Sequence, residues 1–237
     1  DARLLNDPRP RIWDAAGPTQ VYMTAPMDLA PSGGPALTAT SLIPDLHHYA
    51  GRGGRVFALW KDAAGVETNV STFVLAELAK AYGKSVDPVD VFAYVAAVLA
   101  TPAYTEKFRS DLIRPGLRVP LTAAVDLFVE AAELGRTVLW LHTFGERFVD
   151  PSRGRPEGLP RLPQERAPFI PKSGTISSNP ERFPDSIDYD PAESQLKVGT
   201  GFIENVPPAV WAYAISGKPV LGQSFSYRRK NRDPPQI

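Results

Sequence analysis

The sequence predicts an α+β fold in which an inserted helical sub-domain of about five helices separates regions of mixed strand and loop. The 25 prolines and 18 glycines gather outside residues 71–148, and inside that block apolar residues recur every three to four positions. We expect one domain over residues 1–237, because this length is large for one domain and small for two. The expected sub-regions are β and loop at 1–70, helices at 71–148, a basic proline-rich loop at 149–182 and a β-rich region with a basic tail at 183–237.

The overall composition excludes several classes of protein. Hydrophobic residues make up 43% of the chain and charged residues 22%, which is typical of a folded globular protein. The absence of cysteine excludes disulfides, thiolate zinc sites and cysteine nucleophiles. The 26 basic residues balance the 26 acidic ones, so the chain is not basic throughout, although local basic patches stay open.

Two further features concern location and completeness. No window approaches the roughly 20 apolar residues of a membrane span, since the longest apolar stretch is Val91–Ala100. No signal peptide is recognisable, and we expect no membrane partner. The absence of cysteine fits a cytoplasmic protein. Because the chain begins with Asp1 and not with methionine, we expect a fragment of a longer polypeptide.

Residues 1–70 are expected to form short strands joined by loops. β-Branched and aromatic residues predict strands at Gln20–Thr24 and Arg55–Trp60. The sequence PSGGP at 31–35 predicts a loop between them. Proline is too frequent here for helices, so none is expected.

Residues 71–148 carry repeated helix start signals. Asn69 or Ser71 can cap a first helix that stops at Gly83. Asp87-Pro88 and Thr101-Pro102 each place a capping residue before proline, which predicts a second and a third helix.

The remaining helical boundaries depend on glycine. We expect the third helix to end at Pro115-Gly116 and a fourth to open at Thr122. Gly135 is expected to stop the fourth helix, and a fifth follows through Val138 and Phe144.

The C-terminal third changes character twice. Residues 149–182 lack periodicity and are rich in proline and arginine, and loops of this length are usually functional or disordered. Two short runs flank the turn Asp190–Glu193 and predict a hairpin over 187–198. Alternating large and small residues predict a strand at Val210–Ile215, and a basic tail follows.

One catalytic pattern is incomplete. Pro184-Asp185 with Gln195-Leu196-Lys197 approaches the two carboxylates and lysine with which many nucleases hold a divalent metal. Gln195 stands where the second carboxylate is needed, so a plain hairpin explains the same residues. A metal-dependent nuclease using the 185–197 hairpin is kept as an alternative function.

Other catalytic signals are weaker still. His47 and His48 point to opposite sides of a strand, so both cannot easily bind one metal ion. His142 lies in an apolar helical pattern, where a core or interface role is expected. Asp233-Pro234-Pro235-Gln236 superficially resembles an amino-methyltransferase loop, but lacks the aromatic residue that stacks on a flipped base. We therefore expect no catalytic, cofactor-binding or metal-binding residue in this chain.

Basic residues in segments with few acids, at 153–172 and 218–232 and at Arg52 with Arg55, indicate DNA binding. Lysine and arginine neutralise phosphates, and arginine, glutamine and asparagine read base edges through paired hydrogen bonds. A solvated surface would carry the same residues, so a protein-interaction domain without a DNA role is a second alternative. The residues expected to contact DNA are Arg52, Arg55, Arg153, Arg155, Lys218, Gln223, Arg228, Arg229, Lys230 and Arg232.

Several strings occur in the order found in one protein family. They are LLNDPRP at 4–10 with Trp13, LIPDLHH at 42–48, GRGGRV at 51–56, AYVAAV at 93–98, PAYT at 102–105, GLRVPLT at 116–122, LWLHTFGERF at 139–148, VPPAVW at 206–211, and Ser216-Gly217 with Tyr227-Arg228. On these strings the chain resembles the C-terminal specificity region of type ISP restriction–modification enzymes over nearly its whole length. It departs from them where tryptophan is often found near the position of Phe225.

The resemblance implies a target-recognition domain that reads an asymmetric site in the major groove of double-stranded DNA. In such bacterial enzymes, which act in phage defence, a nuclease, an ATP-driven translocase and an adenine-N6 methyltransferase precede this region in one polypeptide. The implied partners are double-stranded DNA and the methyltransferase domain. S-adenosylmethionine, ATP and Mg²⁺ are implied for the other domains only, and the helical block is expected to dock against the methyltransferase or support the reading surface.

Overall fold

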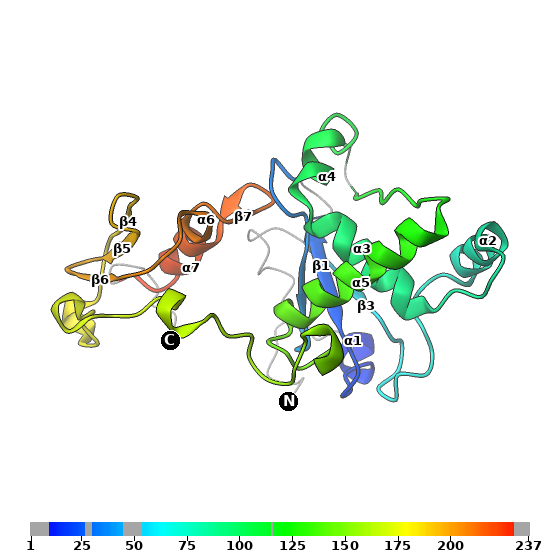
Figure 1. Ribbon diagram of the computed structural model, residues 1–237, viewed down its shortest axis with the longest axis horizontal. Helices are drawn as coiled ribbons and strands as arrows, with labels where there is room; N and C mark the ends of the chain where they lie inside the picture. The colour runs from blue at the N-terminus through cyan, green and yellow to red at the C-terminus, as the bar shows by residue number, and fades with distance from the viewer. Residues whose placement is uncertain (1–9, 27–29, 45–53, 115, 230–237) are drawn as a thin grey trace. The chain divides into compact units, whose positions relative to one another are not determined.

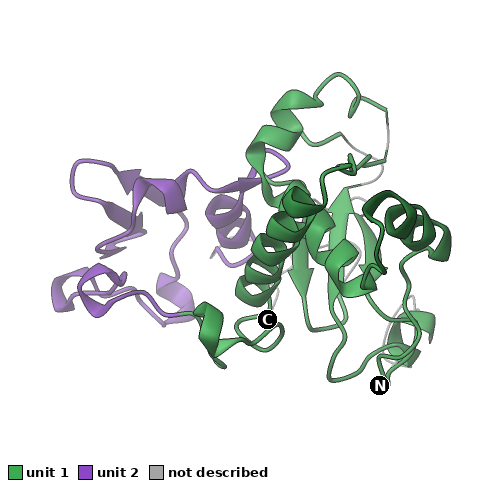
Figure 2. Ribbon diagram, turned by 45° about the vertical axis from the view of Figure 1, so that its right-hand side comes forward, with its two compact units in different colours: residues 1–160 green, residues 161–237 purple. Residues whose placement is uncertain are grey.

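The chain folds into two compact units. The computed structural model describes residues 10–26, 30–44, 54–114 and 116–229. Unit 1 comprises residues 1–160 and unit 2 residues 161–237 (Figure 2). Each unit combines helices with a small antiparallel sheet (Figure 1), which confirms the predicted α+β class. None of the described helices is both long and apolar enough to cross a membrane.

The sheet of unit 1 has three antiparallel strands. Strand β1 (Tyr22–Pro26) lies between β2 (Thr38–Thr40) and β3 (Gly54–Ala58). Every residue of β1 is buried, because both of its edges are paired and the helices cover it. The predicted strands at 20–24 and 55–60 are confirmed with boundaries shifted by about two residues.

Proline at the first helical position marks several helix starts. Helices α2 (Thr72–Tyr82), α3 (Pro88–Ala100) and α4 (Pro102–Lys107) begin where the capping signals predict. The Asp87 carboxylate accepts a hydrogen bond of 2.8 Å from the backbone N–H of Val89. Helix α4 ends at Lys107, earlier than expected, and turns follow it. The expectation of no helix in residues 1–70 is wrong, since Pro10 opens the short helix α1 (Pro10–Asp14).

Gly135 lies in the middle of a helix and does not end one. The two helices expected on either side of it are a single helix, α5 (Val125–His142), so the block 71–148 holds four described helices. A Cβ atom added at Gly135 would overlap the Ala93 carbonyl oxygen of α3. The glycine therefore permits close contact between two helices. Helix α5 ends before the predicted Phe144 because Phe144 and Gly145 adopt positive φ angles of 54° and 76°.

Three tyrosine hydroxyls fix the connection between α4 and α5. Tyr104, Tyr94 and Tyr82 donate to the backbone carbonyls of Arg118, Pro120 and Thr122 at 2.9, 2.8 and 2.7 Å. The Tyr94 ring also stacks on Phe128 of α5, with 5.1 Å between ring centroids. Residues 116–122 have no regular secondary structure, and these bonds hold them in an extended path.

A buried glutamine joins α1, β1 and the segment after β3. Gln20 is 1% exposed, and its side chain makes four hydrogen bonds. Its Nε2 donates to the carbonyls of Ala15 and Trp60, and its Oε1 accepts from the N–H groups of Val21 and Trp60. Complete pairing of this kind removes the penalty of burying an amide.

Unit 2 contains a meander of three short strands. Strands β4 (Ile187–Asp190), β5 (Gln195–Val198) and β6 (Gly201–Ile203) pair in sequence order, which confirms the predicted hairpin. Among the described residues of unit 2, the buried apolar side chains are Leu196 and Val206. Residues 149–182, which begin in unit 1 and continue into unit 2, form an irregular path with four described 3-10 turns, at Pro151–Arg153 (η2), Gln164–Arg166 (η3), Lys172–Gly174 (η4) and Pro180–Arg182 (η5).

The strand predicted at Val210–Ile215 is mostly wrong. Pro208 opens the helix α6 (Pro208–Trp211), and the Trp211 ring stacks on Tyr189 of β4 at 5.7 Å. Only β7 (Ala214–Ile215) is extended, and it pairs with β8 (Lys218–Pro219). The two turn residues, Ser216 and Gly217, have φ angles of 52° and 82°, as a tight hairpin turn requires. The helix α7 (Val220–Ser226) follows.

His142, at the end of α5, accepts a hydrogen bond at Nδ1 from the backbone N–H of Ala39 in β2, at 3.1 Å. Burial lowers the pKa of His142 below the ordinary 6.5, because a charged imidazole would lose its hydration. The neutral ring thus connects the helical block to an edge strand of the sheet.

We predict that Gly135→Ala lowers the free energy of unfolding by about 2–3 kcal/mol, because the new methyl group must push α5 away from α3. Urea unfolding followed by circular dichroism measures the change. Gly33→Ala is the control, since a Cβ at Gly33 meets no atom within 4 Å. Equal stability of the two variants would show that the helices do not depend on this contact.

Stability should also fall in weak acid. The folded state holds His142 neutral with a lowered pKa, so the unfolded state binds the extra proton more readily. The stabilisation is complete above about pH 6.5 and decreases as the pH falls toward the lowered pKa of the folded state. Thermal melts between about pH 7 and pH 5 measure this loss, and His142→Gln should make the melting temperature less sensitive to pH in that window.

Candidate nucleic-acid interface

The predicted DNA-contacting residues fall into three groups. Arg52, Lys230 and Arg232 lie outside the described residues. Arg55, Arg153 and Arg155 belong to unit 1, and Lys218, Gln223, Arg228 and Arg229 belong to unit 2.

The hairpin β7–β8, helix α7 and the residues just after α7 carry four of the predicted residues. Lys218 is exposed on β8, one residue after the tight turn at Ser216-Gly217. Gln223 is half-buried within α7, and Arg228 and Arg229 are exposed just beyond its end. A stretch of 15 residues, 215–229, therefore presents three cations and an amide without an acid.

The two arginines after α7 differ in how they are held. The Arg228 guanidinium folds back, and its Nη1 donates to the carbonyl and the hydroxyl of Ser224 at 2.9 and 2.7 Å. This contact caps the last turn of α7, where the helix dipole favours a cation. Arg229 is exposed and forms no ion pair with any described residue. Arg229 is thus available to an anionic partner.

Arg155 is buried and ion-paired inside unit 1. Only 3% of it is exposed, and its Nη2 lies 3.0 Å from Glu133 of α5 and 3.5 Å from Asp150. Trp140 of α5 adds a hydrogen bond of 3.0 Å to the Pro156 carbonyl. These contacts hold residues 150–156 against α5, which favours a structural role for Arg155 over direct contact with a phosphate.

Arg153 and Arg55 are exposed elsewhere on unit 1. The Arg153 side chain is 59% exposed, and its Nη1 lies 3.7 Å from Glu133, a weak surface pair. Arg55 is exposed on β3 opposite Ala25. Near Arg153, the hydrogen bond from the Ser152 hydroxyl and the positive charge of Arg155 keep the pKa of Asp150 below its usual value.

The proline-rich segment supplies further cations that were not among the predicted site residues. Arg161, Arg166, Lys172 and Arg182 are all exposed in unit 2. They share the segment with Glu165 and Glu181, so it is less basic than the tail. Because acids lie close to them in the sequence, these cations are a weaker signal for phosphate binding than those of the tail.

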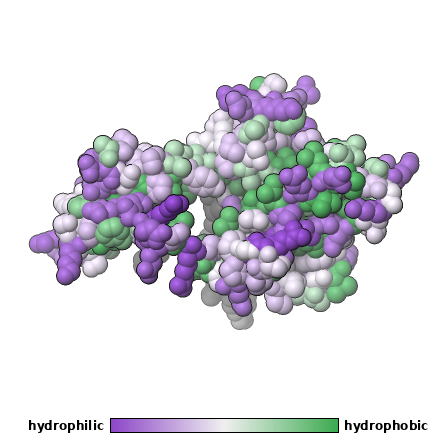
Figure 3. Space-filling view, viewed as in Figure 1, coloured by the Kyte–Doolittle hydropathy of each residue, from purple (hydrophilic) through white to green (hydrophobic). Residues whose placement is uncertain are grey.

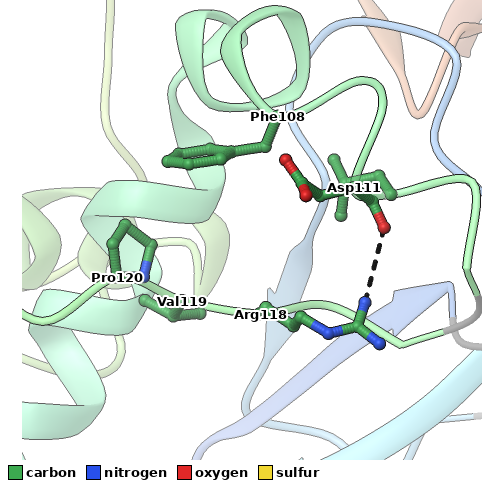
Figure 4. A pocket seen from close by; sticks show the side chains of 6 residues that line it. Phe108, Asp111, Arg118, Val119 and Pro120 are labelled. Carbon is green, nitrogen blue, oxygen red and sulfur yellow. Dashed lines mark hydrogen bonds between the residues drawn. The ribbon is translucent and has the colours of Figure 1, made fainter.

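A pocket in unit 1 is formed partly by the segment 116–122. It is lined by Phe108, Asp111, Leu112, Arg118, Val119 and Pro120 (Figure 4). Arg118 Nη1 donates to the carbonyls of Gly116 and Asp111 at 3.2 and 3.5 Å. The guanidinium thus braces the surrounding loop. The lining of the pocket includes one carboxylate, Asp111, but no second acid, histidine or hydroxyl that could work with it. These residues therefore do not form a catalytic site.

The 185–197 hairpin is arranged as a structural turn. The Asp190 carboxylate accepts from the N–H groups of Ala192 and Glu193, and Lys197 Nζ lies 3.0 Å from it. The hydrogen bond from Lys197 lowers the pKa of Asp190. Because Lys197 is engaged in this ion pair, it is not free to position a water molecule. Throughout residues 10–26, 30–44, 54–114 and 116–229, no three His, Asp or Glu side chains gather as metal ligands would.

A comparison with protein families assigns the chain. The family model of the type ISP C-terminal specificity domain matches residues 1–236. The chain belongs to this family. No curated protein matches it in sequence.

Solved structures show that this specificity domain shares its fold with parts of much larger proteins. A DrdV–DNA complex aligns with 92% of this chain at a TM-score of 0.62 and 20% identity. The ATP-dependent type ISP restriction–modification enzyme LlaBIII bound to DNA aligns with 86% at 0.58 and 13% identity. A nuclease-deletion mutant of the type ISP enzyme LlaGI with a DNA substrate mimic aligns with 90% at 0.54 and 16% identity. The chain covers 21%, 12% and 14% of those chains, respectively.

We predict that Glu133→Gln lowers the free energy of unfolding by about 2 kcal/mol, because the buried Arg155 loses one of its two anionic partners. Glu67→Gln is the matched control. It breaks the exposed pair with Lys61 and should change stability by less than about 0.5 kcal/mol. Chemical denaturation measures the free energy of unfolding of both variants. If Glu133→Gln left it unchanged, Arg155 would not anchor residues 150–156.

Proposed function

We propose that this domain recognises a specific sequence in double-stranded DNA for a type ISP restriction–modification enzyme. The match of the specificity-domain family to residues 1–236 is the observation that carries this proposal. The solved relatives LlaBIII and LlaGI are DNA complexes, as is DrdV, which supports the same class of partner. In this proposal, other domains of a longer cytoplasmic polypeptide methylate adenine at N6 or cleave DNA with ATP, and they hold S-adenosylmethionine and Mg²⁺.

The segment 215–229 is our candidate for the DNA-contacting element. Exposed Lys218 and Arg229 can pair with phosphates, and the tight β7–β8 turn gives Lys218 a defined position. Arg228 is oriented by Ser224, and Gln223 is the residue in this segment with the bidentate amide that reads adenine. Arg55, Arg153, Arg52, Lys230 and Arg232 are proposed as further contacts, and Arg155 is proposed to position the segment that carries Arg153.

The geometry does not favour either alternative. A metal-dependent nuclease needs a free lysine and a second carboxylate, whereas Lys197 is paired with Asp190 and Gln195 is neutral. A pure protein-interaction domain would not need an acid-free basic segment.

Selection from a pool of randomised duplexes tests the function directly. The 237-residue chain is immobilised, and the retained duplexes are sequenced after washing at increasing salt. We expect enrichment of one asymmetric sequence. Retention that is independent of sequence at every salt concentration would contradict a specificity role and leave only nonspecific binding.

We predict that removing Arg228 and Arg229 together, as a double substitution to Gln, weakens duplex binding. Each lost phosphate contact reduces the magnitude of the slope of log K against log salt by about 0.9, so the pair should reduce it by about 1.8. Fluorescence anisotropy over a salt series measures the slope. Lys80→Gln with Lys84→Gln is the matched control, because it removes two exposed cations from unit 1. An unchanged slope in the Arg228/Arg229 variant would exclude the tail as a phosphate contact.

A further inference from the structure

Helix α5 exposes a row of leucines on the side that faces away from the core. Leu127, Leu134 and Leu141 follow one another at intervals of seven and are 56%, 60% and 48% exposed. Residues seven apart lie above one another on a helix, so the three form a single row. Hydrophobic patches interrupt the polar surface over the helical part of unit 1 in Figure 3.

The row has the spacing of a helix-pairing seam. Val138 lies between Leu134 and Leu141 at steps of four and three residues, which is the pattern of contact positions in a coiled coil, whereas Ala131, at the equivalent place between Leu127 and Leu134, packs partly against the core. The core-facing side of α5 is formed by other residues, including Phe128, Ala132 and Leu139. The exposed leucines therefore add little to the core of unit 1. Single exposed leucines are ordinary on protein surfaces, but a regular row on one helix marks an interaction surface.

An acidic edge runs beside this row. Asp126 and Glu130 are exposed, lie one turn apart, and form no ion pair among the described residues. Glu133 continues the edge and is paired with Arg155. A partner that covers the leucines therefore gains most if it places lysine or arginine beside its own apolar residues.

The acidic edge also decides between possible occupants. An anionic membrane surface attracts amphipathic helices with basic edges, which is the reverse of this pattern. A second copy that paired its own α5 with this one would present the same acids, and the one basic residue of that helix besides His142, Arg136, is paired with Asp90. Both occupants would thus leave Asp126 and Glu130 opposed by no cation.

We propose that the row Leu127–Leu134–Leu141 docks an amphipathic helix with lysine or arginine at its edges, carried by another domain of the same polypeptide. This inference rests on the proposed function, because a domain that selects the DNA target must be held in a fixed position relative to the domains that act on the DNA. The matching regions are 12–21% of the solved chains, so in those proteins most of the polypeptide lies outside this fold. Docking along α5 uses residues of unit 1 alone and none of segment 215–229.

Thiol labelling tests the proposal, because the chain has no cysteine of its own. Leu134→Cys is made in the 237-residue chain and in the complete polypeptide, and the rate of maleimide modification at position 134 is followed by mass spectrometry. We expect labelling to slow by at least about tenfold in the complete polypeptide, because the core of an interface excludes water and reagent. Val66→Cys, at a loop residue that is 81% exposed, is the control and should label at the same rate in both.

Charge reversal identifies the occupant. Asp126→Lys with Glu130→Lys, combined with Leu134→Cys in the complete polypeptide, should restore fast labelling, because a basic partner is then repelled. Equal labelling of the introduced thiol in the chain and the complete polypeptide overturns the proposal. Protection that grows with protein concentration, or that survives the charge reversal, overturns it too, since it identifies a second copy or a partner without basic edges.

Duplex binding by the 237-residue Leu134→Cys variant separates this proposal from the proposed function. Normal DNA affinity with fast labelling in the complete polypeptide rejects the docking surface alone. Protection of the thiol at position 134 together with salt-independent or undetectable DNA binding by the chain rejects the DNA-recognition role and leaves the docking surface in place.

Discussion

The close contact between α3 and α5 is the constraint on which unit 1 depends. Gly135 of α5 faces the Ala93 carbonyl of α3 at a distance that leaves no room for a side chain. The contact brings Phe128 onto Tyr94 and allows His142, at the far end of α5, to reach β2. Core packing transmits such a constraint because protein interiors are as dense as organic crystals. The same contact fixes which side of α5 is buried, and so which leucines face outward.

Polar side chains extend this frame to segments without regular structure. Three tyrosines hold residues 116–122 by their backbone carbonyls, Gln20 joins the start of β1 to Trp60, and Arg155 holds residues 150–156 against α5. Several strings that carry the family resemblance coincide with these positions, including AYVAAV at 93–98 and GLRVPLT at 116–122. The resemblance is thus carried by the scaffold, and it identifies the family without identifying a DNA sequence.

The two units differ in the size of their apolar cores. Unit 1 has a large apolar core, whereas the buried apolar side chains among the described residues of unit 2 are Leu196 and Val206. Unit 2 consists largely of short strands, a tight hairpin and loops with exposed cations. A small core and a high share of loop are common in regions that contact other molecules. Zero net charge for the whole chain is compatible with this division, because the acid-free segment 215–229 is balanced by acids elsewhere.

The sequence by itself determined the features that depend on neighbouring residues. Capping residues and prolines predicted the starts of α2, α3 and α4, and the turn Asp190–Glu193 predicted the hairpin, because these signals act over a few residues. Tertiary structure decided the rest. Gly135 has the local chemistry of a helix stop, and only the position of α3 turns it into a packing site. Val210 and Trp211 alternate like a strand, but Pro208 and the Tyr189 ring place them in a helix. Arg155 and Arg229 are the same residue type in basic segments. The chain path buries the first beside Glu133 and leaves the second exposed, since burial and pairing depend on residues distant in the sequence.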